Sequence, residues 1–384
     1  MCIFGAKSPS ISVLTLNVGV KMKNILSMAF ILVFSSSVFA GGAQMGSHQG
    51  HNAMSSGKSS SGVHFYGRMY VGYDDKQTGS AADVENLDDG GSKSRLGLKF
   101  TESISSGIQL VGNLEYKFDI GDGTSTNETS CTSVSEATSC RTFDLHVGNL
   151  GFKTPYGYFG AGTFETPYKT MGQYDNNMDT AIALNEHGGT SQGASGMAGN
   201  VESVLAYSAT MGPATLSYTY AVSDDRAAND NTNTDQGDYS LGLLFKDMLV
   251  HGLSFGYSRT HVQAVSGGSG ESNDRFHASM KVMPHMGVFV SLEDLSIPGS
   301  YNSSTKGDIT TVGTHYKMGM TDWQIVYAKG DSDGAATNDY KTLGVSAQMN
   351  LSKSSDLTIG YIKQDFDSTG DDITTRGIGL THKF

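Results

Sequence analysis

The sequence has too little hydrophobicity and too few basic residues for two common protein classes. Only 38% of its 384 residues are hydrophobic, and its mean hydropathy is -0.26. A protein built from several apolar membrane helices is thereby excluded. Lysine and arginine number 26 against 38 acidic residues, a formal net charge of -12. Nucleic-acid-binding proteins usually carry the opposite sign, so we expect no nucleic-acid partner.

Proline and tryptophan are also scarce, whereas glycine and tyrosine are abundant. The chain has 6 prolines and 1 tryptophan, but 49 glycines, 18 tyrosines and 17 phenylalanines. The low proline content argues against a low-complexity chain, in which glycine and proline rise together. A tyrosine-rich composition favours β-strands and surfaces at which one end of each ring meets water.

The amino-terminal segment predicts export. Met22-Lys23-Asn24 forms a short basic region, a mainly apolar run follows over residues 25–34, and Val38-Phe39-Ala40 supplies the small residues of a cleavage site. A transmembrane anchor is the alternative, but the apolar run is shorter than a bilayer requires. We expect an upstream extension and signal peptide over residues 1–40, with the true start at Met22 and cleavage after Ala40. A flexible Gly/Ser-rich leader over residues 41–61 follows.

Cleavage changes the charge and the cysteine count. It removes three lysines and no acid, which leaves 23 basic and 38 acidic groups and a net charge of -15. It also removes Cys2, so that Cys131 and Cys140 remain. In an exported chain this spacing favours one disulfide. A zinc site is the alternative, but the stretch between the two cysteines offers only Glu136 as a further ligand, and we expect neither a metal nor a cofactor.

Hydrophobicity alternates with a period of two from Val63 onward. In residues 63–74 and 357–364 apolar residues or glycines occupy every second position, which is typical of strands with two different faces. Sixteen such runs follow one another. They lie near residues 63–74, 93–102, 107–120, 142–153, 156–164, 201–210, 214–224, 237–246, 252–263, 275–283, 286–294, 308–318, 322–330, 341–350, 355–366 and 373–384.

The connections between these runs alternate in length. Short ones, such as 103–106, 154–155 and 284–285, alternate with long ones, of which 165–200 is the longest. Outer-membrane barrels have short periplasmic turns and long external loops in this order. A closed barrel also pairs every backbone group within lipid. The sequence therefore predicts an all-β protein, a transmembrane antiparallel β-barrel of 16 strands over residues 62–384.

Several motifs along the strands resemble those of the general-diffusion porins of Gram-negative outer membranes. The similar segments occur in the family's order over roughly residues 63–384. They are Phe65-Tyr66-Gly67-Arg68, Ser94–Phe100, Gly148–Lys153, Gly157–Gly162 and the closing segment Gly377–Phe384. The resemblance implies a trimeric pore for ions and small hydrophilic solutes in the outer membrane. It also implies that Phe384 ends a strand read by the barrel-assembly machinery.

The resemblance further implies a constriction of the pore. In such porins the third long loop, here 165–200, folds inward, and its acids face basic side chains of the wall. Arg68 and Arg95 match two of those basic positions, whereas His146 stands where the family usually has arginine. The expected constriction residues are Arg68, Arg95, His146, Asp175, Asp179 and Glu186. The alternative role of each loop acid is to hold the loop to the wall by hydrogen bonds.

The basic side of the expected constriction has fewer permanent charges than in the family, because His146 stands in place of an arginine. Together with the net charge of -15, this predicts a weak preference for cations. A substrate-selective channel, such as one for sugars, is the alternative, and a structural barrel or an outer-membrane enzyme comes after it. Scattered histidines without a Gly-x-Ser-x-Gly or His-Glu-x-x-His motif argue against an enzyme. The polar external loops predict contact with lipid and lipopolysaccharide.

Overall fold

The computed structural model describes most of the region predicted to form the barrel. The residues described are 61–81, 83–88, 94–118, 120, 143–177, 180–191, 193–194, 197–222, 236–263, 270–296, 307–333, 339–367 and 372–384. The predicted signal peptide and all of the leader except Ser61 lie outside them, as do Cys131, Cys140 and Asp179. The disulfide therefore stays a prediction.

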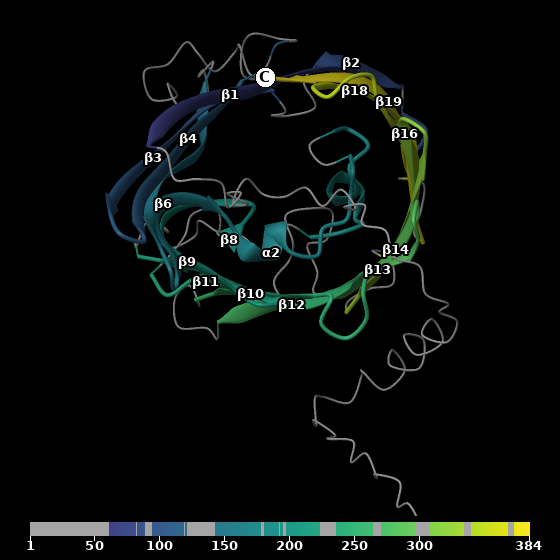
Figure 1. Ribbon diagram of the computed structural model, residues 1–384. Coiled ribbons are helices and arrows are strands. Elements are labelled where there is room, and N and C mark those ends of the chain that lie inside the picture. Colours follow the sequence, from purple (N-terminus) through teal and green to yellow (C-terminus); the bar gives the residue numbers. More distant parts are fainter. Residues whose placement is uncertain are drawn as a thin grey trace, which may run out of the picture. The chain divides into compact units, whose positions relative to one another are not determined.

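Sixteen long antiparallel strands form one closed sheet (Figure 1). Each strand pairs with the next along the chain, and the first pairs with the last, which closes the barrel. The strands are β1 (Gly62–Thr78), β3 (Ser94–Ser105), β4 (Ile108–Phe118), β5 (Asp144–Thr154), β6 (Gly157–Glu165), β9 (Asn200–Met211), β10 (Ala214–Ala221), β11 (Tyr239–Lys246), β12 (Leu253–Val262), β13 (Glu271–Met283), β14 (Met286–Leu295), β15 (Gly307–Met318), β16 (Thr321–Ser332), β17 (Tyr340–Asn350), β18 (Ser355–Phe366) and β19 (Ile373–Lys383). All sixteen predicted strands are confirmed.

Two strand boundaries differ from the prediction for a physical reason. β13 begins at Glu271 rather than near residue 275, and β1 continues to Thr78. Their added residues are polar, so they break the alternation while their backbone groups still pair with neighbouring strands. The predicted loop 75–92 also contains a short strand, β2 (Val84–Asp88), which pairs with β1 at Gly72–Lys76. β2 thereby pairs with backbone groups of β1 that extend beyond the start of β3.

Side chains alternate between the two faces of the wall as the period of two predicts. On β17 the outward residues Leu343 and Val345 are exposed, whereas the inward neighbour Gly344 is buried. Outward apolar side chains can contact lipid hydrocarbon because the paired backbone is satisfied within the sheet. Among the described residues, no helix combines the length and the apolar character needed to span a membrane.

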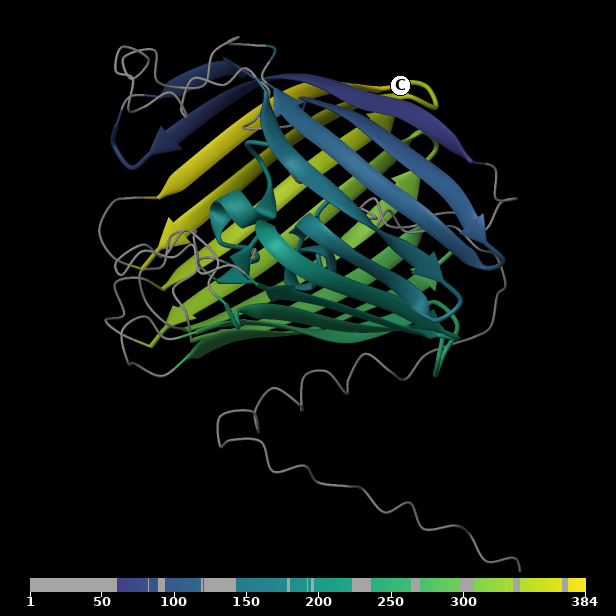
Figure 2. The ribbon, with the colours of Figure 1, turned by 90° about the vertical axis from the view of Figure 1, so that its left-hand side faces the viewer.

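The strands run obliquely to the barrel axis and are joined at one end by tight turns (Figure 2). Gly212, between β9 and β10, and Gly319, between β15 and β16, have φ angles of 59° and 62°. An L-residue with a side chain rarely takes this conformation, so glycine is favoured at both turns. These short turns leave the long connections at the opposite end.

The seam that closes the barrel is hydrogen-bonded at its very end. Phe384 and Gly67 exchange two backbone hydrogen bonds, each with an N···O distance of 3.0 Å. The ring of Phe384 lies directly over Gly67, where an added Cβ would come within 2.4 Å of it. Gly67 therefore leaves the space that the terminal aromatic ring occupies.

Candidate functional site

The connection between β6 and β9 lies inside the barrel, and we call its residues 166–199 the inner loop (Figures 1 and 2). It contains the helical turn α2 (Pro167–Thr170), the 3-10 turn η4 (Leu184–His187) and the short strands β7 (Gly193–Ala194) and β8 (Met197–Ala198). Thr166 begins α2 by accepting a hydrogen bond from the Lys169 amide at 3.2 Å, which is a standard helix cap.

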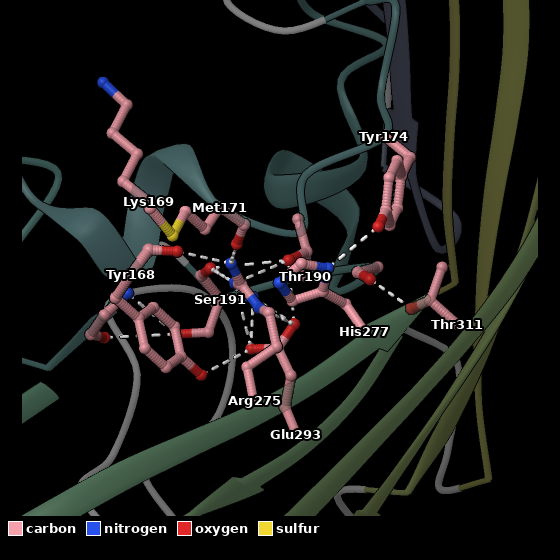
Figure 3. Close-up of polar contacts among 12 residues, drawn as sticks. Tyr168, Lys169, Met171, Tyr174, Thr190, Ser191, Arg275, His277, Glu293 and Thr311 are labelled. Carbon is pink, nitrogen blue, oxygen red and sulfur yellow. Dashed lines mark hydrogen bonds and ion pairs between the residues drawn. The ribbon is translucent and has the colours of Figure 1, made fainter. Parts of the chain in front are cut away.

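A buried ion pair on the wall holds the root of the inner loop (Figure 3). Arg275 of β13 and Glu293 of β14 stand directly opposite each other, and Arg275 Nε lies 3.2 Å from Glu293 Oε1. Neither side chain is exposed. The guanidinium also lies over the ring of Tyr168, with Cζ 4.2 Å from the ring centroid. A buried pair of this kind is stable only when its remaining hydrogen-bonding groups are satisfied.

The inner loop supplies those missing hydrogen-bond partners. Arg275 donates to the carbonyl oxygens of Tyr168 and Met171 at 2.5 and 3.1 Å, and to the Ser191 carbonyl. Glu293 accepts from the Tyr168 hydroxyl at 2.9 Å and from the Thr190 hydroxyl at 2.8 Å. We call these six residues the anchor cluster: Tyr168, Met171, Thr190, Ser191, Arg275 and Glu293. The cluster connects two ends of the inner loop to one ion pair.

The middle of the inner loop is bonded to the next strands along the wall. The carbonyl of Tyr174 accepts from Gln324 Nε2 at 2.8 Å and from His315 Nε2 at 2.9 Å. The Tyr174 hydroxyl lies 2.8 Å from His277 Nδ1. Asn177 donates to Ser346 on β17 at 2.8 Å. Burial raises the pKa of Tyr174 to about 12, so the hydroxyl keeps its proton at neutral pH.

The stretch that follows η4 is fixed to the same side of the barrel. Tyr340 donates to the Gly188 carbonyl at 2.8 Å, and Thr342 donates to the His187 carbonyl at 2.6 Å. His187 is 1% exposed, and its Nε2 donates to the Ala181 carbonyl at 2.8 Å. Burial lowers the pKa of His187 to about 4, although that hydrogen bond works in the opposite direction. The imidazole is therefore neutral in the docked loop.

Two apolar clusters complete the docking of the inner loop. Ile182 and Leu184 pack with three wall residues, Phe289, Val326 and Ile362, and all five are buried. The second cluster joins Met197 of the loop to the neighbouring wall and consists of Phe164, Met197, Val201, Val204, Ala221 and Val262. Removing this apolar surface from water stabilises the docked loop by about 25 cal/mol per Å².

The predicted acids of the inner loop serve different roles. Asp175 is 3% exposed and accepts from the amides of Asn177 at 2.8 Å and Leu184 at 2.6 Å. Its carboxylate thus joins two parts of the loop, whereas the alternative weighed for it was a bond between the loop and the wall. Glu186 is half-buried and accepts from the Asn185 amide group at 3.0 Å.

The predicted basic residues of the wall are brought together, but an acid lies among them. Arg95 on β3 and His146 on β5 both contact Glu115 of β4, at 3.4 and 2.8 Å. Arg68 stands directly opposite Arg95. Glu115 is 1% exposed and was missed as a site residue. It stands opposite Gly97, which shares the inward face of β3 with Arg95, so the short turn between β3 and β4 and the alternation of faces could have indicated it.

A longer basic row crosses this part of the wall. In direct cross-strand register stand Lys383 of β19, Arg68 of β1, Arg95 of β3 and Lys117 of β4. We call these four residues the basic row. Like charges directly opposite each other destabilise a sheet unless water or counter-charges separate them. Glu115 beside Arg95 and Asp356, 3.5 Å from Lys383, supply two such counter-charges.

The inner loop contributes a cation near this row. Lys169 Nζ lies 2.9 Å from Glu165 Oε1 and 3.1 Å from Asn200 Oδ1. Asn200 in turn donates to the His146 carbonyl at 2.5 Å. The loop therefore brings a base as well as acids into the barrel. Across the part of the chain that the structure describes, no three His, Cys, Asp or Glu side chains are placed to hold a metal ion.

This arrangement defines a class of protein, a membrane β-barrel whose interior holds a docked loop and facing charged groups. A family model described as Gram-negative porin matches residues 28–384, and the chain belongs to that family. It is an outer-membrane diffusion pore of a Gram-negative bacterium. A comparison with curated proteins found no match.

Solved porin structures share the fold. The anion-selective porin from Comamonas acidovorans is 16% identical, with a TM-score of 0.65 over 85% of this chain and 100% of that one. OmpF of Salmonella typhi, in complex with daunomycin, is 13% identical, with a TM-score of 0.62 over 84% and 97%. OmpT of Vibrio cholerae, in its trimer form, is 15% identical, with a TM-score of 0.58 over 85% and 100%. At these identities the likeness establishes the fold.

Proposed function

We propose that the barrel conducts ions and small hydrophilic solutes by passive diffusion, and that the inner loop narrows the passage. The observation that carries this proposal is the docking of residues 166–199 on the inner wall through the anchor cluster and the Tyr174 contacts. A loop held at several points can set a passage of constant width, because contacts with the wall recur along its described residues.

We infer that charges of the lumen, rather than the net charge of the chain, decide which ions pass more easily. Fixed charges act mainly within a Debye length, about 8 Å at physiological salt, so external acids contribute little. The predicted weak cation preference rests on the net charge and on a thinned basic side. The basic row, with Lys117 and Lys383 beside Arg68 and Arg95, supports a weak preference for anions instead.

Assembly and surroundings follow from the family and remain proposals. We infer a homotrimer, which the trimer form of the similar OmpT structure supports. Phe384, 58% exposed and paired with Gly67, is available at the seam as the signal for the barrel-assembly machinery. The external ends of the strands contact outer-membrane lipid and lipopolysaccharide.

The alternative functions have less support. No catalytic residue is assigned, and small or polar inward positions such as Gly344 and Ser346 favour a general pore over an aromatic sugar track.

Single-channel recording of refolded protein in planar bilayers tests this function. We expect stable openings in groups of three and, in a salt gradient, a reversal potential of anionic sign. A cationic sign would keep the pore and restore the preference predicted from net charge. Folded protein that never conducts would remove the pore function and favour a structural barrel.

A further inference from the structure

Lysines recur near the ends of the strands that run toward the short turns. Five of these strands carry one lysine within their last three residues, and β3 carries a sixth near its middle. They are Lys99 of β3, Lys153 of β5, Lys246 of β11, Lys281 of β13, Lys317 of β15 and Lys383 of β19. We call these six residues the lysine ring. In outer-membrane barrels the short turns face the periplasm, so the ring lies at the periplasmic mouth.

Strand periodicity places these lysines on the inner face. Ser240 accepts a hydrogen bond from the Tyr168 amide inside the barrel, and Lys246 follows it by an even number of residues on β11. The same holds for Lys281 after His277, which contacts the inner-loop residue Tyr174. Residues an even number apart on a regular strand share a face.

The other members of the ring are placed by strand register. Lys153 stands opposite Gln109, which shares the inward face of β4 with Glu115. Lys317 is two residues beyond His315, which donates to the inner loop. Lys383 stands opposite Arg68, and Lys99 is four residues beyond Arg95. Lys99 also lies over the ring of Tyr66, with Nζ 4.5 Å from the centroid.

Four acids lie near members of the lysine ring. Asp322 stands opposite Lys317, and Asp356 lies 3.5 Å from Lys383. Asp247 follows Lys246 in the turn, and Glu115 shares the inward face near Lys99. At the end of the long connections, the described acids Asp331, Asp365 and Asp367 form ion pairs with Lys329, Lys363 and Lys341. Acids and bases are therefore matched among these residues, whereas the six lysines of the ring outnumber the four acids just named.

We propose that the lysine ring is a binding site for polyvalent anions, of the polyphosphate class, that enter from the periplasmic side. Lys246, Lys281 and Lys317 form its strongest arc, because they lie on β11, β13 and β15, each two strands from the next. Two strand spacings amount to about 10 Å, which flexible lysine side chains can bridge toward one ligand. This inference rests on the proposed pore function, since the bound anion obstructs the path of smaller ions.

The valence of the ligand decides whether it binds. One exposed amine attracts one negative charge by only about 1 kcal/mol in water, so monovalent anions pass without being held. A ligand with several phosphate groups contacts several amines at once, and these attractions add. Chloride should therefore permeate while a polyphosphate binds and blocks.

Inorganic tripolyphosphate added to one side of a planar bilayer tests this site. We expect reversible block when it is added on the short-turn side, and at least about tenfold weaker block from the long-loop side. The side can be assigned in a Ser352→Cys variant with a membrane-impermeant thiol reagent, because Ser352 lies in the turn between β17 and β18. Raising the salt concentration should weaken the block.

Substitutions then separate the site from a general charge effect. The triple variant K246Q/K281Q/K317Q should raise the half-blocking concentration about tenfold or more while openings persist. The control K329Q/K341Q/K363Q removes three outward lysines near the other end of β16, β17 and β18, and it should leave the block unchanged. Equal block from both sides, or block unaffected by the first variant, overturns the proposal.

Calorimetry keeps this test independent of the proposed function. If the folded barrel never conducts, tripolyphosphate can be titrated into detergent-solubilised protein. Binding that weakens about tenfold in K246Q/K281Q/K317Q supports the site even though the pore function has failed. Absence of binding overturns the site.

Discussion

The two sides of the inner wall use their charged residues differently. On the side formed by β13 to β17, Arg275 and Glu293 are fully buried and their polar atoms bind the inner loop. On the side formed by β19, β1, β3 and β4, the basic row contains residues that are half-buried or exposed, such as Arg68 and Lys383. The first side fixes a structure, and the second presents charge to the lumen.

This difference shows that an inward charge is not by itself a pore charge. Arg275 lies on an inward strand face, and strand alternation alone would therefore assign it as a cation of the lumen. Its two terminal nitrogens nevertheless donate to Met171 and Thr190 of the inner loop. Its field is cancelled locally by Glu293. Charges that shape permeation must be accessible to the water of the lumen, and exposure separates the half-buried Arg68 and Lys117 from the fully buried Arg275.

The largest effect should come from breaking the docked side. Arg275→Met leaves Glu293 as a buried charge without its partner, which costs about 3–5 kcal/mol. We expect a lower unfolding temperature and a larger, noisier single-channel conductance, because the inner loop loses its root. Thermal unfolding and bilayer recording measure both.

A matched double variant distinguishes charge from packing. R275M/E293L replaces the buried pair by apolar side chains and should recover part of the lost stability. Conductance and stability that do not change in Arg275→Met would show that the anchor cluster does not hold the loop.

Low pH should weaken the docking of the inner loop on the same side of the barrel by a somewhat smaller amount. Burial lowers the pKa of His187 from 6.5 to about 4, so the released imidazole binds a proton at pH values where the docked one does not. Docking is then fully stable above about pH 6.5 and loses up to about 3 kcal/mol as the pH falls toward 4. Conductance noise recorded from pH 7.5 to 4.5 measures this release.

The variant His187→Gln provides the control for that pH dependence. Glutamine can still donate to the Ala181 carbonyl but does not titrate in this range. Its noise should vary less with pH than that of the wild-type channel. Identical pH profiles would assign the effect to other groups.

Removal of one hydrogen bond should have a smaller effect. Tyr340→Phe deletes the donor to the Gly188 carbonyl and should lower stability by about 1 kcal/mol. The outward-facing Tyr361→Phe is the comparison, since that ring is on the lipid side. Urea unfolding of both variants should show a loss in the first only.

Neutralising the opposite side should change selectivity and hardly change stability. R68Q/K117Q removes two members of the basic row, so the reversal potential should move toward cation preference. Stability should stay within about 0.5 kcal/mol of the wild type. A comparable shift in the outward variant Lys341→Gln would show that the basic row has no special role.

The wall could be predicted from the sequence because two independent signals agree on it. Alternation identifies each strand, and the alternation of short and long connections identifies the barrel. Polar strand ends such as the start of β13 were missed because outward residues beyond the lipid need not be apolar. The Arg275–Glu293 pair could not be read from the tight turn alone, because a bulge between Lys281 and Met283 shifts the register of β13 and β14 by one residue.

The inner loop could not be predicted at the same level. Its contacts depend on backbone carbonyls, such as those of Tyr174 and Gly188, which any residue type provides. The sequence therefore indicated a long loop with acids but not which atoms those acids bind. Asp175 illustrates this limit, because its carboxylate binds amides of the loop itself.

The closing seam has a consequence for the order of events in biogenesis. β1 needs β19 as a partner, and Arg376 and Asp75, which contact each other across that seam, are 301 residues apart in sequence. Until the final strand has crossed the inner membrane, β1 keeps one edge unpaired. Unpaired edges invite aggregation. The exported chain must therefore be kept from folding during its passage through the periplasm, and a chain that loses β19 should never leave that state.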